Sequence, residues 1–368
     1  MGEGTGVLVI GGGPAGLAAA IAARMKGFEV TLADGAKPPI DKVCGEGLMP
    51  GTLRALRELG VAIVPGDGQV FRGIRFVDSV STVEANFSGA SGFGMRRTIL
   101  HQKMVERAEE CGVTLLWNTP VAGLTGEGAI LGEKLMKARW IIGADGVHSR
   151  VRCWTGLNAR ARLEKRFAQR RHFRVRPWTD CMEIHWSNRA QAYVTPLSND
   201  ETCVAVISRD PRMRLADAWR EFPVLTSYLR HAEPSSAERG AVTVTRRLSQ
   251  VYRGNVALTG DASGSVDAIT GEGLCLSFRQ ALALADALSK GKLLSYQRVH
   301  RQLARRPHIM GRLLLMLDQY PALRKRAVRI LAKESGLFAQ LLAAHLGETP
   351  TTFLAATSLR LGWQFLTA

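Results

Sequence analysis

A glycine-rich loop near the amino terminus constrains the fold more than any other feature of this chain. Residues 11–16 read GGGPAG, after the apolar run 7–10 and before the alanine-rich stretch 14–27. This spacing fits G-x-G-x-x-G and predicts a buried parallel strand, a tight turn and a helix. Such a loop binds the pyrophosphate of a dinucleotide at the free N–H groups of the helix. The expected cofactor contacts here are Gly11, Gly13, Pro14, Ala15 and Gly16.

Each glycine of this pattern serves a separate steric purpose. Gly11 permits the tight turn, Gly13 lets the backbone approach the pyrophosphate, and Gly16 lets the helix pack closely on the strand. Asp34 follows the second expected strand, residues 29–33, and lies 23 positions after Gly11. Its carboxylate suits ribose hydroxyls, although it could instead open a turn. Several dinucleotide cofactors use the same loop, so the loop alone does not identify the one that binds here.

The order of strand patterns predicts a domain that is interrupted by a second one. Buried, parallel-type strands are expected near both ends of the chain, whereas the middle alternates apolar and polar residues. We therefore predict an α/β fold with a Rossmann-like cofactor domain assembled from separated segments, an inserted, mainly antiparallel β substrate domain and a C-terminal helical tail. The predicted boundaries are 1–72, 97–157 and 248–292 for the cofactor domain, 73–96 and 158–247 for the β domain, and 293–368 for the tail.

Positive charge is concentrated in two parts of the chain. The formal net charge is +17, and basic residues gather in 160–176 and 300–329. Solvated faces are the simplest interpretation, and attraction to an anionic membrane surface is the alternative. Nucleic-acid binding is disfavoured because no aromatic residues are interleaved with the charges. Apolar faces in 311–317 and 353–366 could lie on a membrane, or could pack on the substrate domain or another subunit.

Cysteine usage and hydropathy place further limits on function. The six cysteines form no CxxC pair, so we expect no metal site. The chain has no apolar run of about 18 residues and no recognisable leader at its start. We therefore expect a cytoplasmic protein, with peripheral membrane contact as an option.

Two further glycine-containing segments carry a family resemblance. Residues 259–274 read TGDASGSVDAITGEGL, and 143–150 read GADGVHSR. Together with the first loop they resemble flavoproteins of the p-hydroxybenzoate hydroxylase and geranylgeranyl reductase superfamily, over nearly the whole chain. The resemblance implies FAD as cofactor and NAD(P)H as transient reductant. It also implies cofactor contacts from Asp145, Gly146, Gly260, Asp261, Gly271, Gly273 and Leu274, with Arg150 organising its loop. Asp267-Ala268 departs from the family's usual Asp-Pro beside the ring.

The remaining expected site residues also follow from this resemblance. Residues 41–50, DKVCGEGLMP, are similar to a stretch of the geranylgeranyl reductase branch beside the flavin, with Cys44 and Gly45 at the matching positions. Cys44 would touch substrate or simply fill a turn. Arg97 matches a family arginine near the ribityl and phosphate groups, with Arg96 as the competing candidate. Tyr193 and Pro196 are expected on the substrate side.

The resemblance leaves the reaction open between two enzymatic readings. We favour a monooxygenase that hydroxylates a hydrophobic or phenolic substrate, because the tail segment 320–347 resembles hydroxylases of lipid-like polyketides. The alternative is a reductase that saturates isolated double bonds of prenyl or lipid chains. A flavin-binding sensor without turnover is a third reading. The halogenase segment Trp-x-Trp-x-Ile-Pro is absent, and no side chain is assigned a catalytic role.

Overall fold

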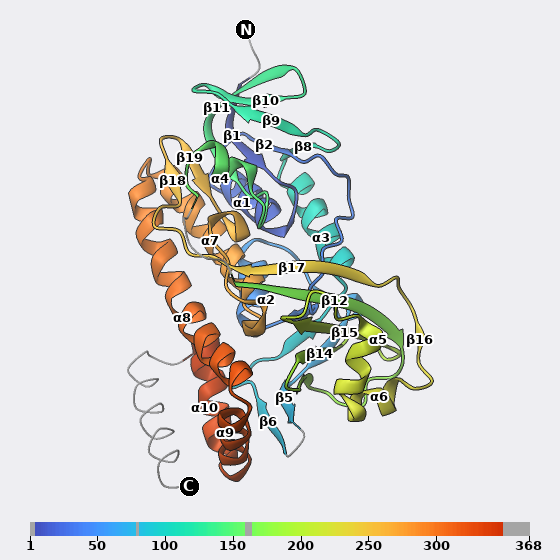
Figure 1. Ribbon diagram of the computed structural model, residues 1–368. Helices are drawn as coiled ribbons and strands as arrows, with labels where there is room; N and C mark the ends of the chain where they lie inside the picture. Colours follow the sequence, from blue (N-terminus) through green and yellow to red (C-terminus); the bar gives the residue numbers. More distant parts are fainter. Residues whose placement is uncertain (1–3, 79–80, 159–163, 349–368) are drawn as a thin grey trace.

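A parallel sheet forms the part of the molecule that carries the amino terminus. The computed structural model describes residues 4–78, 81–158 and 164–348. The parallel strands lie in the order β19, β11, β1, β2 and β8 (Figure 1). Their bounds are β1 Gly4–Ile10, β2 Val30–Ala33, β8 Thr114–Leu116, β11 Lys134–Gly143 and β19 Val256–Leu258. Strands from both ends of the chain thus build one sheet, as the sequence predicts.

Short antiparallel additions complete this sheet. The hairpin of β9 and β10 pairs with β11, and β18 pairs with β19 at the edge. These strands are β9 Val121–Leu124, β10 Gly128–Leu131 and β18 Tyr252–Arg253. The hairpin was not predicted, because its strands are only four residues long.

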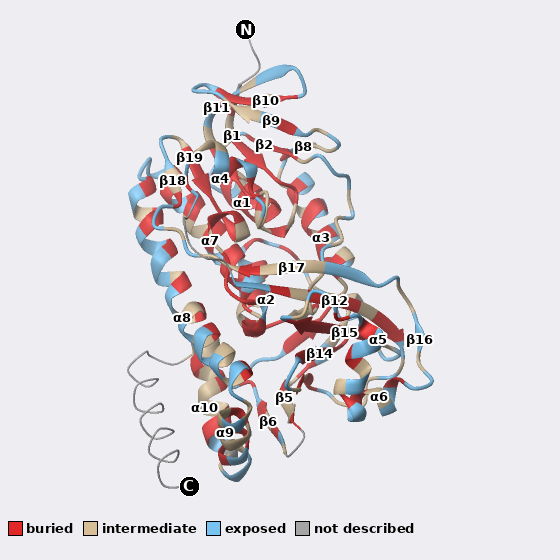
Figure 2. Ribbon diagram, in the orientation of Figure 1, coloured by how far each residue is buried: buried red, intermediate tan, exposed pale blue. Residues whose placement is uncertain are grey.

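Helices cover the parallel sheet and bury its apolar side chains. Helix α1 is buried along most of its length, which its run of alanines allows because small side chains permit close approach (Figure 2). It packs against α7 and α3. The helices of this part are α1 Pro14–Met25, α2 Pro50–Glu58, α3 Arg97–Glu110, α4 Arg150–Trp154 and α7 Gly273–Ser289; the 3-10 turns are η1 Pro65–Asp67, η3 Gly260–Ser263 and η4 Ala268–Thr270.

The inserted segment forms a second sheet in the order β16, β12, β15, β14, β13, β5 and β6, with β17 also paired to β12. All these pairs are antiparallel except β5 with β13. The bounds are β5 Gly73–Asp78, β6 Thr82–Asn86, β12 Glu164–Arg174, β13 Met182–Trp186, β14 Ala190–Pro196, β15 Glu201–Ser208, β16 Glu233–Pro234 and β17 Arg239–Thr245. A small third sheet joins β3 Gly47–Leu48, β4 Gln69–Phe71 and β7 Gly92–Gly94.

The two faces of the antiparallel sheet have different partners. Ala192 and Val194 pack against α5 Leu215–Ala218, η2 Trp219–Glu221 and α6 Pro223–Leu229. Tyr193, between them, belongs to the other face, together with Met182 and Ile207. This alternation follows the period of a strand.

Three consecutive helices complete the chain that the structure describes. They are α8 Leu293–Gln319, α9 Pro321–Lys333 and α10 Ser335–Leu346. In Figure 1, α8 runs along the side of the molecule from the parallel sheet towards β6, where α9 and α10 pack. None of the described helices is long and apolar enough to cross a membrane.

The α/β fold, with its parallel core, separate antiparallel sheet and C-terminal helices, is therefore confirmed. The stated domain boundaries stay a prediction, and the apolar face expected in 353–366 lies outside the described residues.

A buried arginine fixes α9 to the antiparallel sheet. Arg324 is only 1% exposed. Its Nε donates to Asp78 on β5 at 2.9 Å, and its Nη2 donates to the Asn188 side chain at 2.9 Å. The guanidinium also lies over the Trp186 ring, 5.7 Å from its centroid. Removing one member of such a pair takes a buried, charge-assisted contact from the other.

Arg324→Met is therefore expected to lower the free energy of unfolding by about 3–5 kcal/mol. Arg329→Met is the matched control, because Arg329 is exposed on the same helix, and its effect should stay within about 0.5 kcal/mol. Urea denaturation followed by tryptophan fluorescence measures both. Equal effects from the two substitutions would contradict the anchoring role of Arg324.

Candidate active site

A cavity of about 710 Å³ lies between the parallel and antiparallel sheets. Residues at the carboxyl ends of β1 and β2 line one side, which is where open α/β sheets bind ligands. Sixteen of the predicted site residues line it: Gly11, Gly13, Pro14, Ala15, Asp34, Cys44, Gly45, Arg97, Asp145, Gly146, Tyr193, Gly260, Asp261, Gly271, Gly273 and Leu274. The structure does not place Gly16 and Pro196 in this lining.

The glycines of the first loop differ in their surroundings. Gly11 has a φ of +112°, and a Cβ there would lie 2.6 Å from the Ala144 carbonyl oxygen. A Cβ on Gly16 would lie 1.8 Å from the Gly11 carbonyl oxygen, so this glycine acts through packing. No atom lies within 4 Å of a Cβ built on Gly13. The open space over Gly13 suits a pyrophosphate at the start of α1.

Two side chains, Asp34 and His101, bind the backbone of this loop at Gly12. Asp34 accepts hydrogen bonds from the N–H groups of Gly12 at 2.5 Å and Ala36 at 2.7 Å. His101 Nε2 lies 2.8 Å from the Gly12 carbonyl oxygen, and the Ile40 N–H donates to His101 Nδ1 at 3.4 Å. Burial lowers the pKa of His101, so its neutral form donates to the carbonyl. Sequence reasoning left His101 unassigned, although it lies one helical turn after Arg97.

The loop of residues 143–150 is held by an arginine that the sequence analysis did not single out. Asp145 Oδ2 accepts from the N–H groups of Arg150 at 2.7 Å and Val151 at 3.1 Å, while its Oδ1 is buried without a partner. The Arg150 side chain is exposed. Arg152 is buried and donates to the carbonyl oxygens of Ala262 at 3.1 Å and Val147 at 2.8 Å. Arg152 therefore joins residues 143–150 to residues 259–274.

Residues 259–274 present the N-terminus of α7 to the cavity. Gly271 adopts a φ of +65°, and α7 begins at Gly273, where a Cβ would meet nothing within 4 Å. The positive end of the helix dipole would favour a reduced flavin, which is negatively charged near N1.

Two polar contacts accompany this segment. Asp261 pairs with Lys42 at 2.8 Å, and both side chains are partly exposed. Ser263 Oγ lies 2.9 Å from His300 Nε2.

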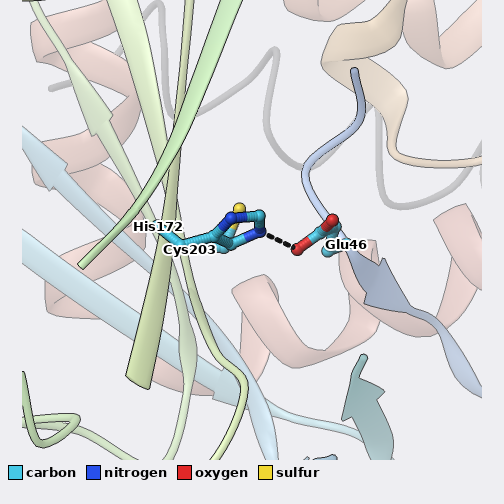
Figure 3. Close-up of side chains that lie close together, drawn as sticks. All are labelled: Glu46, His172 and Cys203. Atoms are coloured by element: carbon cyan, nitrogen blue, oxygen red, sulfur yellow. Dashed lines mark hydrogen bonds and ion pairs between the residues drawn. The ribbon is translucent and has the colours of Figure 1, made fainter. Parts of the chain in front are cut away.

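Glu46 joins the 41–50 segment to the antiparallel sheet (Figure 3). It is 3% exposed and adopts a φ of +59°. Its Oε1 accepts from Arg170 Nη1 at 2.6 Å and from the Arg97 N–H at 2.9 Å; its Oε2 lies 2.7 Å from His172 Nε2. Arg170 also binds Asp41 through both terminal nitrogens. The sequence analysis did not single out Glu46, although its position between Gly45 and Gly47 is visible in the sequence.

The same cluster has the composition of a small metal site. Candidate ligand atoms of Glu46, His172 and Cys203 lie within 4.8 Å of one another. However, both carboxylate oxygens of Glu46 already have protein partners, and the Arg170 charge opposes a cation. The contacts describe a buried ion-pair network that positions the loop.

The side of the cavity formed by the antiparallel sheet is largely apolar. Ala168, Met182, Ala205 and Ile207 line it beside Tyr193. The Tyr193 hydroxyl donates to Gln191 at 3.3 Å, and burial raises the pKa of this phenol, which stays protonated. Pro196 ends the same strand, and its carbonyl oxygen approaches Gly94 instead of the cavity.

Cys44 adds a thiol to the same cavity. Its Sγ accepts a hydrogen bond from the Glu46 N–H at 3.3 Å. Burial raises the pKa of Cys44, while the positive charge of Arg97 acts in the opposite direction. The thiol is therefore protonated near neutral pH, and a nearby positive charge is available if it loses the proton.

These residues fit FAD. The open space above Gly13 and Gly273 provides two places where the backbone can approach a ligand, at the starts of α1 and α7. Among the residues that the structure describes, Asp145 Oδ1 and Arg97 Nε find no hydrogen-bond partner although both are buried, and both residues line the same cavity. The fold and the site together define a flavoprotein.

Residues 4–292 match the family described as FAD binding domain. The chain belongs to this family and is an FAD-dependent oxidoreductase. It is similar to digeranylgeranylglycerophospholipid reductase 1 of Methanopyrus kandleri, with 30% identity over 73% of this chain and 76% of that protein. It is 27% identical to menaquinone reductase of Mycobacterium tuberculosis, over 78% of this chain and 77% of that protein.

The fold is also shared with solved structures. A flavoprotein/dehydrogenase from Cytophaga hutchinsonii superposes with a TM-score of 0.82 at 20% identity, covering 94% of this chain and 93% of that chain. This likeness supports the fold alone.

Gly13→Val is expected to weaken FAD binding by about 1–3 kcal/mol, because the added side chain fills the space above the loop. The apoprotein should keep its melting temperature, since nothing in the fold contacts that position. Fluorescence titration of apoprotein with FAD measures the affinity. Gly126→Val is the control, because a Cβ there also meets nothing. Undiminished FAD affinity in Gly13→Val would count against this placement.

The pH dependence of stability depends on two histidines of α8, of which His300 is buried and His308 is partly exposed. Burial, followed by nearby positive charge, lowers the pKa of His300 and of His308 to about 4 from 6.5. Both are neutral in the folded chain but take up protons in the unfolded chain below about pH 6.5. The free energy of unfolding should therefore fall as the pH falls from about 6.5 to about 4.

His300→Gln should reduce this pH slope, whereas His231→Gln, at an exposed position, should leave it unchanged. Urea titrations at several pH values provide the measurement. An identical slope in His300→Gln and the wild type would show that His300 does not contribute.

Proposed function

We propose that this protein is an FAD-dependent reductase that saturates an isolated double bond in an isoprenoid-like or other apolar lipid chain. NAD(P)H is proposed as the transient reductant. The observation that carries the proposal is the position of the Cys44 thiol in a cavity whose sheet side is largely apolar. Such a wall accepts a hydrocarbon chain, and the thiol offers a proton where the chain would lie.

Reduction of an alkene requires a hydride on one carbon and a proton on the other. Bound FAD, once reduced, supplies the hydride. Cys44 donates the proton from Sγ, and the Arg97 charge stabilises the resulting thiolate until solvent returns a proton. The apolar side chains Met182, Ala205 and Ile207 exclude water and align the chain. No electron acceptor other than the alkene is needed.

The named relatives support the same reaction class. Both are reductases, and each similarity covers about three quarters of the two chains. Their names refer to isoprenoid-bearing lipids, which agrees with the apolar wall. The solved structure reported above shares the fold at 20% identity and does not bear on the choice of reaction.

Hydroxylation by a monooxygenase is the second candidate. The Tyr193 ring beside the apolar wall would suit a phenolic substrate, and the tail segment 320–347 resembles hydroxylases of lipid-like polyketides. This reaction requires oxygen and adds one oxygen atom to the product. Double-bond reduction adds two hydrogen atoms and proceeds without oxygen.

Anaerobic turnover with NADPH separates the two reactions. The probes are geranylgeraniol and a menaquinone with an unsaturated side chain, each in detergent, and products are identified by mass spectrometry. The reductase proposal predicts a product that has gained two hydrogen atoms, at a rate lowered about 100-fold in Cys44→Ala. NADPH-dependent bleaching of the flavin should be unchanged in that variant, and Cys153→Ala, at an exposed position, is the control.

Hydroxylated product formed only in air, with no reduced product under nitrogen, would overturn the reductase proposal in favour of the monooxygenase. Normal alkene reduction by Cys44→Ala would remove the proton-donor role from this thiol.

A further inference from the structure

We propose that the outer face of α8 binds the surface of an anionic lipid bilayer. This outer face is defined here as Arg298, Arg305 and Arg312 together with Ile309, Leu313, Met316 and Tyr320, the last at the end of the helix. The proposal concerns membrane binding and does not depend on which reaction the cavity catalyses.

An exposed apolar stripe is the first observation. Ile309, Leu313, Met316 and Tyr320 are each between 41% and 55% exposed. Their spacing of four, three and four residues places them on one side of a helix. Four large apolar side chains in one exposed row exceed the single, scattered residues that an ordinary surface carries.

A row of arginines runs beside this stripe. Arg298, Arg305 and Arg312 are exposed and seven residues apart, so they follow one another along the helix. Within the described part of the chain, no ion pair involves any of the three. Arg312 precedes Leu313, and Arg305 lies one turn before Ile309. By this spacing, the apolar and cationic rows share the outer side of α8.

The sequence around this face contains almost no negative charge. Residues 292–333 include eleven Lys and Arg residues and one acidic residue, Asp318. Asp318 is buried and pairs with Arg209 at 2.7 Å. His308 adds no charge near neutral pH, because burial and the neighbouring arginines lower its pKa to about 4. An anionic partner thus meets three exposed arginines that form no ion pair within the described residues.

Exposed arginines next to exposed apolar side chains favour a lipid bilayer over other anionic partners. Guanidinium groups bind lipid phosphates, while adjacent large apolar side chains enter the boundary between headgroups and acyl chains. A nucleic acid would use the arginines but would leave the apolar stripe exposed. Each Lys or Arg near an anionic membrane surface strengthens binding, and salt weakens it.

The opposite side of α8 packs against a turn that borders the cavity. A Cβ on Gly311 would lie 3.3 Å from Thr270 of η4, and Ala268 of the same turn lines the cavity. The helix therefore lies between this turn and the proposed membrane face. This arrangement would hold the cavity close to a lipid-soluble substrate.

Vesicle co-sedimentation of the FAD-loaded protein tests the proposal. The vesicles are pure phosphatidylcholine, or phosphatidylcholine with phosphatidylglycerol at a fixed fraction. We expect binding to the anionic vesicles alone, and weaker binding as salt is raised. The charge variant Arg298→Glu, Arg305→Glu, Arg312→Glu should bind at least about tenfold more weakly. The stripe variant Ile309→Ser, Leu313→Ser, Met316→Ser should lose binding to a similar degree.

A matched control changes the same net charge elsewhere. Arg212→Glu, Arg214→Glu and Arg220→Glu alter exposed residues around α5, on the other side of the view in Figure 1, and should bind within about twofold of the wild type. Normal flavin content and NADPH-dependent bleaching establish that each variant is folded.

Equal losses in the charge variant and the control would overturn the proposal, because net charge alone would then explain binding. So would the absence of binding to anionic vesicles, or equal binding to neutral ones. Unchanged vesicle binding by the stripe variant, with tight binding to an oligonucleotide that only the charge variant abolishes, would identify a polyanion surface instead.

Discussion

The close approach of α1 to β1 is the constraint on which the rest of the structure depends. Gly16 sits where any Cβ would collide with the Gly11 carbonyl, and Gly11 itself turns through a left-handed conformation beside Ala144. The helix can therefore begin directly beyond the strand, with its free N–H groups facing the cavity. Asp34 and His101 then bind the loop through the backbone N–H and carbonyl oxygen of Gly12.

The cavity is assembled from segments that are far apart in sequence, so the contacts between segments determine its shape. Arg152 joins the 143–150 loop to η3, and Glu46 joins the 41–50 loop to α3 and to β12 of the antiparallel sheet. These are buried, charged contacts whose partners are all needed, because one unpaired member would destabilise the interior. They hold the polar side of the cavity, which fits FAD, next to its apolar side.

Local patterns predicted the elements and the cavity lining well, because glycine spacing and strand alternation are short-range signals. Glycine spacing placed Gly13 in this way, whereas Asp145, Gly273 and Tyr193 were expected from the family resemblance; all four line the cavity. The positioning residues His101, Arg152 and Glu46 could not be placed in either way. Their roles arise only when distant segments meet, and a lone histidine, arginine or glutamate carries no periodic signal. Pro196 was placed by resemblance, and its carbonyl faces Gly94 because β14 continues past the cavity.

We expect one FAD molecule to span the space from the start of α1 to the start of α7. Calorimetric titration of the apoprotein with FAD and with FMN tests this placement, because FMN lacks the adenosine part that we expect beside the Gly11–Gly16 loop and Asp34. We expect one FAD per chain, bound at least about 100-fold more tightly than FMN, since pyrophosphate and ribose contacts are lost with FMN. Equal affinity for the two flavins, or no FAD binding, would contradict it.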